Sequence, residues 1–231
     1  MFSLDGKICV VTGASRGLGR AIALAFADQG ADVVLAARSR DDLQGLGYQV
    51  EARGRRALVQ PTDVTETGWD AMLRLNLTAQ VFGAQAAARA MRDRETGGSI
   101  IFLSSIDSLY AAPGGEGIYG ACKAALNNIT QTMAVELGQY RIRVNAIAPA
   151  VVETPLTAPW LATPEARRQR ARFYPLRRVG QPADVAAAAV YFASDEAEWV
   201  SGAVLLVSGG AVMTSDPYRY LMRVNPEDGP A

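Results

Sequence analysis

The stretch Thr12-Gly13-Ala14-Ser15-Arg16-Gly17-Leu18-Gly19 separates a β-branched run at 8–12 from an Ala- and Leu-rich run at 19–29. Glycines at such a junction allow a tight turn and let a pyrophosphate approach the backbone, and the start of the helix offers free N–H groups. The spacing, Gly-x3-Gly-x-Gly, differs from the commoner dinucleotide-binding spacing. The strand before it and the helix after it favour nucleotide binding over the alternative, a structural turn.

The charges near this loop indicate which dinucleotide it binds. NAD-binding proteins usually carry an acid at the end of the second strand, about 20 residues beyond the glycines, to bond the ribose 2′-OH. Here that region reads Val34-Leu35-Ala36-Ala37-Arg38, without an acid, and Arg16 adds a second guanidinium. Two guanidinium groups suit a 2′-phosphate, so the sequence favours NADP(H) over NAD(H). The alternative is that both arginines are solvated surface residues.

Along the rest of the chain, short β-branched runs alternate with longer Ala- and Leu-rich runs, which is typical of a parallel sheet flanked by helices. Strands are expected at 8–12, 32–36, 57–60, 99–103, 143–148 and 204–207. Helices are expected at 19–29, 41–52, 69–92 and 119–137, with two more beginning after Thr163 and at Pro182. We expect one domain over 1–211, with NADP(H) binding and catalysis in it, and a C-terminal tail at 212–231.

Composition excludes several classes of protein. Of the 231 residues, 49% are hydrophobic, 23 are basic, 23 are acidic and none is histidine, so no His-dependent hydrolase or His-ligated metal site is available. Two cysteines are too few for a disulfide framework, which favours a cytoplasmic location. We expect no metal, no signal peptide, no membrane span and, at zero formal charge, no nucleic-acid partner.

A second motif is Tyr119-Gly120-Ala121-Cys122-Lys123, which contains one of only two lysines in the chain. A Tyr and a Lys at i and i+4 share one face of a helix. An ammonium close to a phenol favours the phenolate, so such a tyrosine can act as a general acid or base near neutral pH. The alternative is an exposed helix edge, which the scarcity of lysine makes a weak explanation.

Two polar residues lie upstream of this motif. Ser105 follows the expected strand at 99–103, at the end where open parallel sheets bind ligands. The alternative is an ordinary turn serine. Asn76 lies in an apolar part of the expected helix at 69–92. A buried asparagine needs partners, so Asn76 is either a structural cap or part of a water relay.

In this order the motifs resemble those of the short-chain dehydrogenase/reductases over nearly the whole chain, including members that reduce 3-oxoacyl thioesters. The matching positions are Thr12 to Gly19, Asp63-Val64, Asn76, Ser105, Tyr119-x3-Lys123, Asn145 to Pro149, Val152-x-Thr154 and Ser201-Gly202 to Gly210. The resemblance implies an α/β fold with a Rossmann-type doubly wound parallel sheet. It also implies hydride transfer between a nicotinamide and a carbonyl or alcohol.

The resemblance further assigns roles to single residues. It makes Tyr119 the general acid in reduction, Lys123 the group that tunes Tyr119 and holds the nicotinamide ribose, Ser105 the ligand of the substrate oxygen, and Asn76 the holder of a relay water. The implied cofactor site consists of Gly13, Ser15, Arg16, Gly17, Leu18, Gly19, Arg38, Asp63, Val64, Tyr119, Lys123, Pro149, Val152 and Thr154.

One departure from the family pattern is large. Only 11 residues separate Val64 from Asn76, whereas the family has a helix and a central strand there, and a crossover alone needs about 10 to 12 residues. Losing that strand would interrupt the hydrogen-bonded ladder beside the first strand. Either the chain lacks about 40 residues or the sequence as given omits them, and an intact mass about 4 kDa above 24.5 kDa would show the second.

The substrate and partners are less defined. Six arginines at 167–178 suggest either a docking surface for an acidic carrier or coenzyme A thioester, or a solvated helix face. The Ala- and Leu-rich helices at 69–92 and 119–137 resemble those that pair in the family, so a homodimer or homotetramer is expected. Besides an NADP(H)-dependent oxidoreductase, a catalytically impaired nucleotide-binding protein and a non-redox lyase or isomerase remain open.

Overall fold

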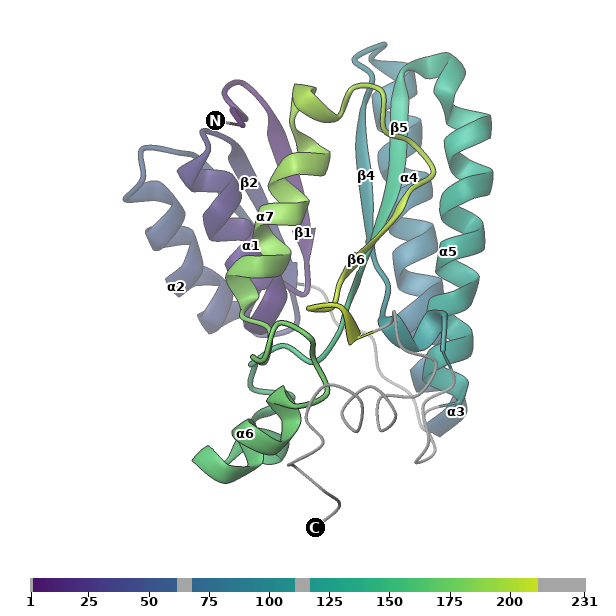
Figure 1. Cartoon of the computed structure of the whole chain (residues 1–231). Coiled ribbons are helices and arrows are strands. Elements are labelled where there is room, and N and C mark those ends of the chain that lie inside the picture. The colour runs from purple at the N-terminus through teal and green to yellow at the C-terminus, as the bar shows by residue number, and fades with distance from the viewer. Residues whose placement is uncertain (1, 62–67, 111–116, 212–231) are drawn as a thin grey trace.

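The computed structural model describes residues 2–61, 68–110 and 117–211 (Figure 1). Asp63 and Val64 and the tail at 212–231 therefore lie outside the described residues. The strands are β1 (Ile8–Thr12), β2 (Asp32–Ala37), β3 (Ala57–Pro61), β4 (Gly98–Leu103), β5 (Ile142–Pro149) and β6 (Val204–Val207). The α-helices are α1 (Gly17–Asp28), α2 (Arg40–Glu51), α3 (Gly68–Leu73), α4 (Ala79–Asp93), α5 (Gly117–Leu137), α6 (Pro164–Ala171) and α7 (Pro182–Ala193).

The described strands form two parallel sheets of three strands, in the orders β1-β2-β3 and β4-β5-β6. The chain is α/β and Rossmann-like, as expected, but the sheet is interrupted between β1 and β4. Strand β3 ends at Pro61 and α3 begins at Gly68. The short connection leaves no room for a crossover helix and a further strand, which is the physical reason for the interruption.

The N-terminal sheet is packed on one face only. Val11, Val33 and Leu35 point toward α1 and α2 and are almost fully buried. On the opposite face, Ile8 and Val10 are 63% and 62% exposed, and Leu58 of β3 is 60% exposed. Because side chains alternate between the faces of a strand, a right-handed crossover helix from β3 would cover this second face.

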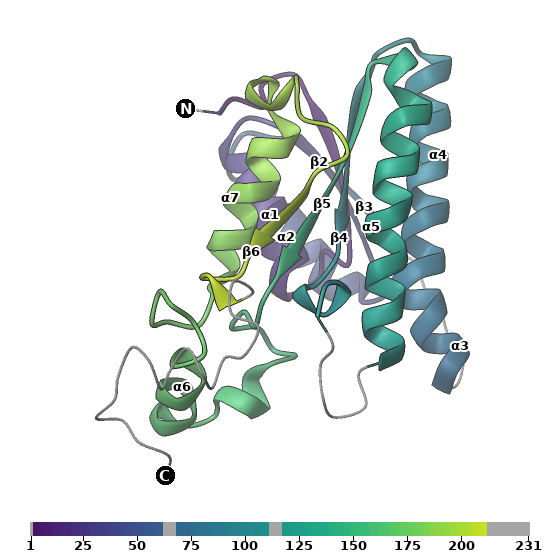
Figure 2. The same ribbon diagram turned by 45° about the vertical axis from the view of Figure 1, so that its right-hand side comes forward.

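The C-terminal sheet is packed on both faces. Ile100 and Phe102 of β4 and Val144 of β5 lie in a core with α4 and α5. On the other face, Ile147 joins the core that α7 shares with the N-terminal sheet. Figure 2 shows α4 and α5 side by side on one face of this sheet and α7 on the other.

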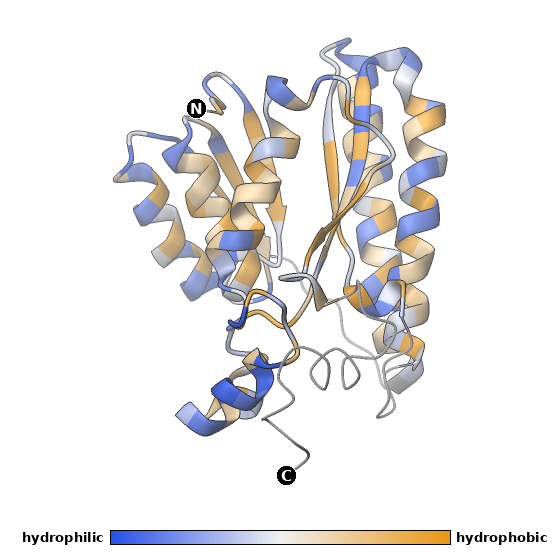
Figure 3. Ribbon diagram, viewed as in Figure 1, coloured by the Kyte–Doolittle hydropathy of each residue, from blue (hydrophilic) through white to orange (hydrophobic). Residues whose placement is uncertain are grey.

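Helix α7 connects the two sheets. It packs against α1, and it also contacts β4, β5 and β6. Its apolar residues, Val185, Val190 and Phe192 among them, belong to the same core as β1 and β2. Figure 3 shows apolar residues along the strands and α7, whereas α6 is mainly hydrophilic. The two sheets therefore share one core on the α1 and α7 side.

The predicted elements agree with the described ones to within two residues, and Thr163 and Pro182 begin helices as expected. Thr163 Oγ1 accepts a hydrogen bond from the Ala166 N–H at 3.1 Å, a typical N-cap. One difference lies in the expected helix at 69–92, where a π-helical turn at Arg74–Thr78 separates α3 from α4. Among the described residues, no helix is long and apolar enough to cross a membrane.

Candidate active site

The glycine loop joins β1 to α1 with the geometry that a dinucleotide-binding turn needs. Gly13 and Gly17 have φ angles of +66° and +57°, a region that favours glycine. A Cβ on Gly19 would lie 2.3 Å from the Gly13 carbonyl oxygen, so only glycine fits this close approach. A Cβ on Gly13 would meet nothing within 4 Å.

The first turn of α1 is open to an anion. Its N-cap residue, Arg16, makes no side-chain capping bond, and the turn holds no acid. Ser15 is half-buried, and Leu18 packs against the core beneath the helix. The N–H groups of this turn are therefore not capped by described side chains, which suits phosphate binding.

Arg16 and Arg38 are both exposed. Arg38 follows β2 directly, so both arginines lie at the carboxyl ends of the first two strands. Within the described ranges, neither makes an ion pair. The acid of β2, Asp32, lies at the opposite end of the strand and pairs with Arg56 at 2.6 Å.

Ser105 caps a short 3-10 turn, Ile106–Ser108, at the end of β4. It is 6% exposed. Its Oγ donates to Asp107 Oδ2 at 2.9 Å and accepts from the Asp107 N–H at 3.2 Å. A Cβ on Gly120 would lie 2.8 Å from the Asp107 carbonyl oxygen, so Gly120 allows this turn to press against α5 next to Tyr119.

Tyr119 and Lys123 lie on one face of α5, as their spacing predicts. Lys123 Nζ is 5.5 Å from the centre of the Tyr119 ring. Lys123 is only 5% exposed, and this burial lowers its pKa from 10.5 to about 8. Ser104 Oγ donates to the Lys123 carbonyl at 3.2 Å, which ties this turn of α5 to the end of β4. Ser105, Tyr119 and Lys123 thus gather at the carboxyl end of the C-terminal sheet.

Lys123 also contacts the interrupted edge of β4. Its Nζ donates to the Leu103 carbonyl at 2.8 Å. The Ser104 N–H donates a hydrogen bond to the Ile147 carbonyl of β5. In a parallel strand, the backbone groups of one residue point to one side and those of the next residue point to the other side. The Leu103 carbonyl therefore points away from β5, toward the side where β4 has no described neighbouring strand. Lys123 satisfies an acceptor that a neighbouring strand would otherwise satisfy.

Asn76 lies in the π-helical turn and is half-buried. Its side-chain amide donates to the Met72 carbonyl at 3.2 Å, and its own carbonyl accepts from Gln80 Nε2 at 3.0 Å. π-Helical turns are rare and often occur at functional sites. The sequence singled out Asn76 but gave no signal for the π turn around it.

The remaining expected cofactor residues follow β5. Pro149 is the last residue of that strand, and Val152 is buried and bridges to Gly180. A side chain on Gly17 would contact Thr154 Cβ at 3.6 Å, so Thr154 lies against the glycine loop. Thr157 Oγ1 accepts from the Thr154 N–H at 2.9 Å and stabilises this turn.

The arginines of the 167–178 segment are largely paired. Arg167 bonds to Glu153, Arg168 to Glu165 and Arg178 to Asp184 at 2.5, 2.5 and 2.6 Å. The guanidinium of Arg170 lies 5.9 Å from the centre of the Phe173 ring. Among the described residues, Arg170, Arg172 and Arg177 form no ion pair, although the charge of Arg172 acts on Glu165. The pairs favour the solvated-face interpretation of this segment.

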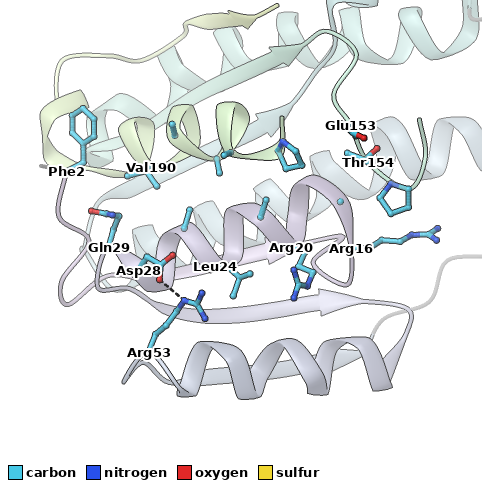
Figure 4. Close-up of a pocket in the computed structure, with 18 residues that line it drawn as sticks. Phe2, Arg16, Arg20, Leu24, Asp28, Gln29, Arg53, Glu153, Thr154 and Val190 are labelled. Atoms are coloured by element: carbon cyan, nitrogen blue, oxygen red, sulfur yellow. Dashed lines mark hydrogen bonds and ion pairs between the residues drawn. The ribbon is translucent and has the colours of Figure 1, made fainter. Parts of the chain in front are cut away.

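A groove of about 990 Å³ lies between α1 and α7 (Figure 4). Arg16 and Thr154 lie at one end, and Phe2 and Val190 lie at the other. Short side chains, Ala21 and Ala25 on α1 and Ala186 and Ala187 on α7, leave this space open. None of Ser105, Tyr119 and Lys123 lines it, so the groove is separate from the site at the end of β4.

Two family models match this chain. The short chain dehydrogenase model matches residues 7–68, and the Enoyl-(Acyl carrier protein) reductase model matches residues 55–212. This chain belongs to the short-chain dehydrogenase/reductase family. The family consists of oxidoreductases with a Rossmann-like fold, and the described sheets and helices agree with that fold.

Individual relatives are similar over most of the chain. An uncharacterised oxidoreductase of Mycobacterium tuberculosis is 36% identical, covering 91% of this chain and 94% of its own. The 3-oxoacyl-[acyl-carrier-protein] reductase of Thermotoga maritima is 33% identical, covering 91% and 99%. A solved Agrobacterium tumefaciens structure with bound NADP, described as a 2-deoxy-D-gluconate 3-dehydrogenase, is 30% identical with a TM-score of 0.84, covering 92% and 99%.

The relatives are longer than this chain within the matched region. The M. tuberculosis alignment runs over 248 positions, whereas 91% of this chain is about 210 residues, so about 38 positions have no counterpart here. This agrees with the roughly 40 residues that the spacing of the motifs indicates. The two family models meet at residues 55–68, where β3 ends.

Sequence reasoning did not identify three features of the site. These are the bond from Ser105 to Asp107, the bond from Lys123 to the Leu103 carbonyl, and the buried phenol of Tyr174, whose pKa burial raises. The acid two residues after Ser105 was the only available signal for the first. The other two depend on segments that are distant in sequence.

Proposed function

We propose that this chain is an NADP(H)-dependent oxidoreductase that transfers a hydride between the nicotinamide and a carbonyl or alcohol substrate. Tyr119 is the general acid in reduction and the general base in oxidation. The observation that carries this proposal is the buried Lys123 ammonium, 5.5 Å from the centre of the Tyr119 ring and hydrogen-bonded to the carbonyl of Leu103 at the end of β4.

The residues at the loop fit a dinucleotide. Gly13 leaves open space where a side chain would stand, and the first turn of α1 presents uncapped N–H groups. The glycine loop would hold the pyrophosphate. Val152 and Thr154, which follow Pro149 at the end of β5, would contact the nicotinamide end. When bound, the nicotinamide supplies the hydride. Asp63 and Val64 would contact the adenine.

The preference for NADP(H) rests on Arg16 and Arg38, two exposed guanidinium groups without a described acidic partner. A phosphate can take bidentate bonds from such groups. The change Arg38→Ala should raise the dissociation constant for NADPH about tenfold and leave that for NADH nearly unchanged. Equal effects on both cofactors would contradict the preference.

The protein groups at the end of β4 would divide the proton chemistry among them. Ser105 Oγ has a single proton, which it donates to Asp107 Oδ2 in the structure, and it would turn this proton to the substrate oxygen. Tyr119 Oη would give the substrate oxygen a proton as the hydride arrives. The Lys123 ammonium favours the phenolate that remains. Asn76 would hold the relay water that restores the proton to Tyr119. General acid catalysis of this kind contributes about 10²- to 10⁴-fold to the rate.

For the substrate, docking of an acidic carrier or coenzyme A thioester would rest on Arg170, Arg172 and Arg177 alone. Surface charge attraction is screened by salt. A KM for acyl thioesters that rises steeply with salt would support this docking, and a salt-independent KM for a small neutral ketone would favour a small substrate. The ion pairs of the other three arginines favour the small substrate.

The change Tyr119→Phe tests the proposal. NADPH oxidation with a panel of ketones should fall by at least about 10²-fold, while NADPH binding, followed by its fluorescence, should change by less than about threefold. Tyr140→Phe, a change at an exposed tyrosine beyond the C-terminus of α5, is a matched control that should keep full activity. Undiminished turnover in Tyr119→Phe would contradict the role of Tyr119.

A second candidate is a catalytically impaired protein that binds the nucleotide. The interruption between β1 and β4, and the bond from Lys123 to the Leu103 carbonyl, favour it. NADPH binding without turnover of any ketone by the unmodified protein would support this second function. We also propose a homodimer or homotetramer through α4 and α5, supported by the exposed Phe82 and Val135.

A further inference from the structure

The Asp107 carboxylate is hydrogen-bonded to the Ser105 hydroxyl group, which the proposed mechanism uses to bind the substrate oxygen. Ser105 Oγ donates to Asp107 Oδ2 at 2.9 Å, and the Asp107 N–H returns a bond to Ser105 Oγ at 3.2 Å. The carboxylate is therefore held one hydrogen bond away from the group that would bind the substrate oxygen. Any substrate on Ser105 would meet this carboxylate.

Asp107 also acts on two other segments, the start of α5 and the segment around Tyr174. Its backbone presses against Gly120, the neighbour of Tyr119 on α5. The pKa of Tyr174 is raised mainly by burial, and the charge of Asp107 adds to this rise, so the carboxylate also acts on the segment that follows β5. Asp107 thus follows the end of β4 in the turn that Ser105 caps, and its charge reaches Tyr174.

The carboxylate has unused capacity for hydrogen bonds. Among the described residues, no Lys or Arg forms an ion pair with Asp107, and no side chain donates to its second oxygen, Oδ1. An ionised carboxylate offers about four acceptor positions and no donor. Asp107 is half-buried, so a ligand donor that replaced water on Oδ1 would form a charge-assisted bond.

We propose that Asp107 is a specificity-determining residue that accepts a hydrogen bond from a hydroxyl on the carbon next to the reacting carbon. The substrates it selects are hydroxy ketones and vicinal diols, and this deepens and rests on the proposed function. At that position a 2-oxo acid presents only the acceptors of its carboxylate, and a 3-oxoacyl thioester presents a methylene, which cannot donate a hydrogen bond to Asp107. The 2-oxo acid would bring two acceptors face to face, and the thioester would displace water from Asp107 without replacing its hydrogen bond, so both would lose binding energy.

The kinetic test uses two ketones of similar size, 2-hydroxycyclohexanone and 2-methylcyclohexanone, with NADPH. The unmodified enzyme should prefer the hydroxy ketone in kcat/KM by about tenfold to hundredfold. Asp107→Asn and Asp107→Ala should reduce the preference to less than about threefold. Asp93→Asn, at the other end of the C-terminal sheet, is the matched control and should keep the full preference. An unchanged preference in both Asp107 variants would overturn the proposal.

A binding measurement separates this proposal from the proposed function. Titration calorimetry compares trans-1,2-cyclohexanediol with cyclohexanol on the unmodified protein and on Asp107→Asn, in the presence of NADP. A diol preference of about tenfold that is lost in Asp107→Asn supports Asp107 even if neither ketone is reduced, in which case only the proposed function fails. Equal affinity for the diol and the mono-alcohol in the unmodified protein overturns the role of Asp107.

Discussion

The N-terminal and C-terminal sheets have the same number of strands and the same parallel arrangement, yet they are packed differently. The C-terminal sheet lies between α4 and α5 on one face and α7 on the other. The N-terminal sheet has α1 and α2 on one face, while Ile8, Val10 and Leu58 are exposed on the other. The difference has one origin, the short connection from β3 to α3, which omits the crossover that would cover this face.

The comparison also separates the two parts of the candidate site. The glycine loop and the two arginines belong to the N-terminal sheet, and Ser105, Tyr119 and Lys123 belong to the C-terminal sheet. Among the described elements, α7 and its shared core make the main connection between the two sheets, and the contact of Thr154 with the glycine loop and the ion pair of Lys7 with Asp195 add to it. A missing crossover thus leaves each half of the site locally intact and weakens the connection between the halves.

The largest effect is expected from restoring the crossover. Insertion of a helix and strand of about 40 residues between Pro61 and Gly68, taken from a relative, should raise the free energy of unfolding by at least about 3 kcal/mol. The reason is that burying Ile8, Val10 and Leu58 contributes about 1.5 to 3 kcal/mol for each side chain. Denaturant unfolding measures this change, and hydrogen exchange should show new protection in β1 and β4.

A Gly/Ser linker of the same length is the control for this insertion. It adds only loop entropy, so it should lower stability slightly and protect neither strand. Equal stability of the two insertions would show that the exposed face is not the weak point of the molecule.

The glycine loop offers a change that affects only the N-terminal half. In Gly19→Ala the new Cβ would meet the Gly13 carbonyl oxygen at 2.3 Å, so the loop must shift. We expect the dissociation constant for NADPH to rise at least about 100-fold, while β4, β5 and the Lys123 site keep their structure. Gly45→Ala on α2, where a Cβ meets nothing within 4 Å, should bind NADPH normally. Normal binding by Gly19→Ala would show that the loop does not hold the cofactor.

The pH dependence of stability that arises from Lys123 shows whether water enters the C-terminal half through the open edge of β4. Burial lowers its pKa from 10.5 to about 8, so the unfolded chain binds more protons between these values and stability rises with pH across this window. Relative to Lys123→Met, the unmodified protein should gain about 2 kcal/mol in unfolding free energy from pH 7 to pH 9.5. Denaturation midpoints at the two pH values measure it, and a constant difference would mean that water reaches Lys123.

The smallest effect compares neighbouring residues on the two faces of β1. Val11 is 6% exposed and Val10 is 62% exposed. Val11→Ala should lower the free energy of unfolding by about 2 kcal/mol through lost burial and a cavity, whereas Val10→Ala should change it by less than about 0.5 kcal/mol. Thermal or urea unfolding of both variants measures this contrast. A large loss in Val10→Ala would mean that a partner or another segment covers this face in solution.

Local patterns in the sequence predicted most of the fold, and together with the family resemblance they named the candidate site residues. Strand and helix ranges follow from hydrophobic periodicity and from caps such as Thr163, and the i and i+4 spacing alone brings Tyr119 and Lys123 to one face. The spacing between Val64 and Asn76 also predicted the missing strand, because the family resemblance implies a helix and a strand there and a crossover has a minimum length.

Only the tertiary structure decided how these residues are used. Three features depend on the packing of segments that local periodicity does not connect. Lys123 donates a hydrogen bond to the Leu103 carbonyl, Ser105 is hydrogen-bonded to Asp107, and one face of the N-terminal sheet is exposed. Burial then changes the chemistry, because a lysine has an ordinary pKa in water and a pKa of about 8 only when the fold removes it from solvent. Residue type and spacing are local properties of the chain, whereas desolvation and strand pairing arise only when distant segments meet.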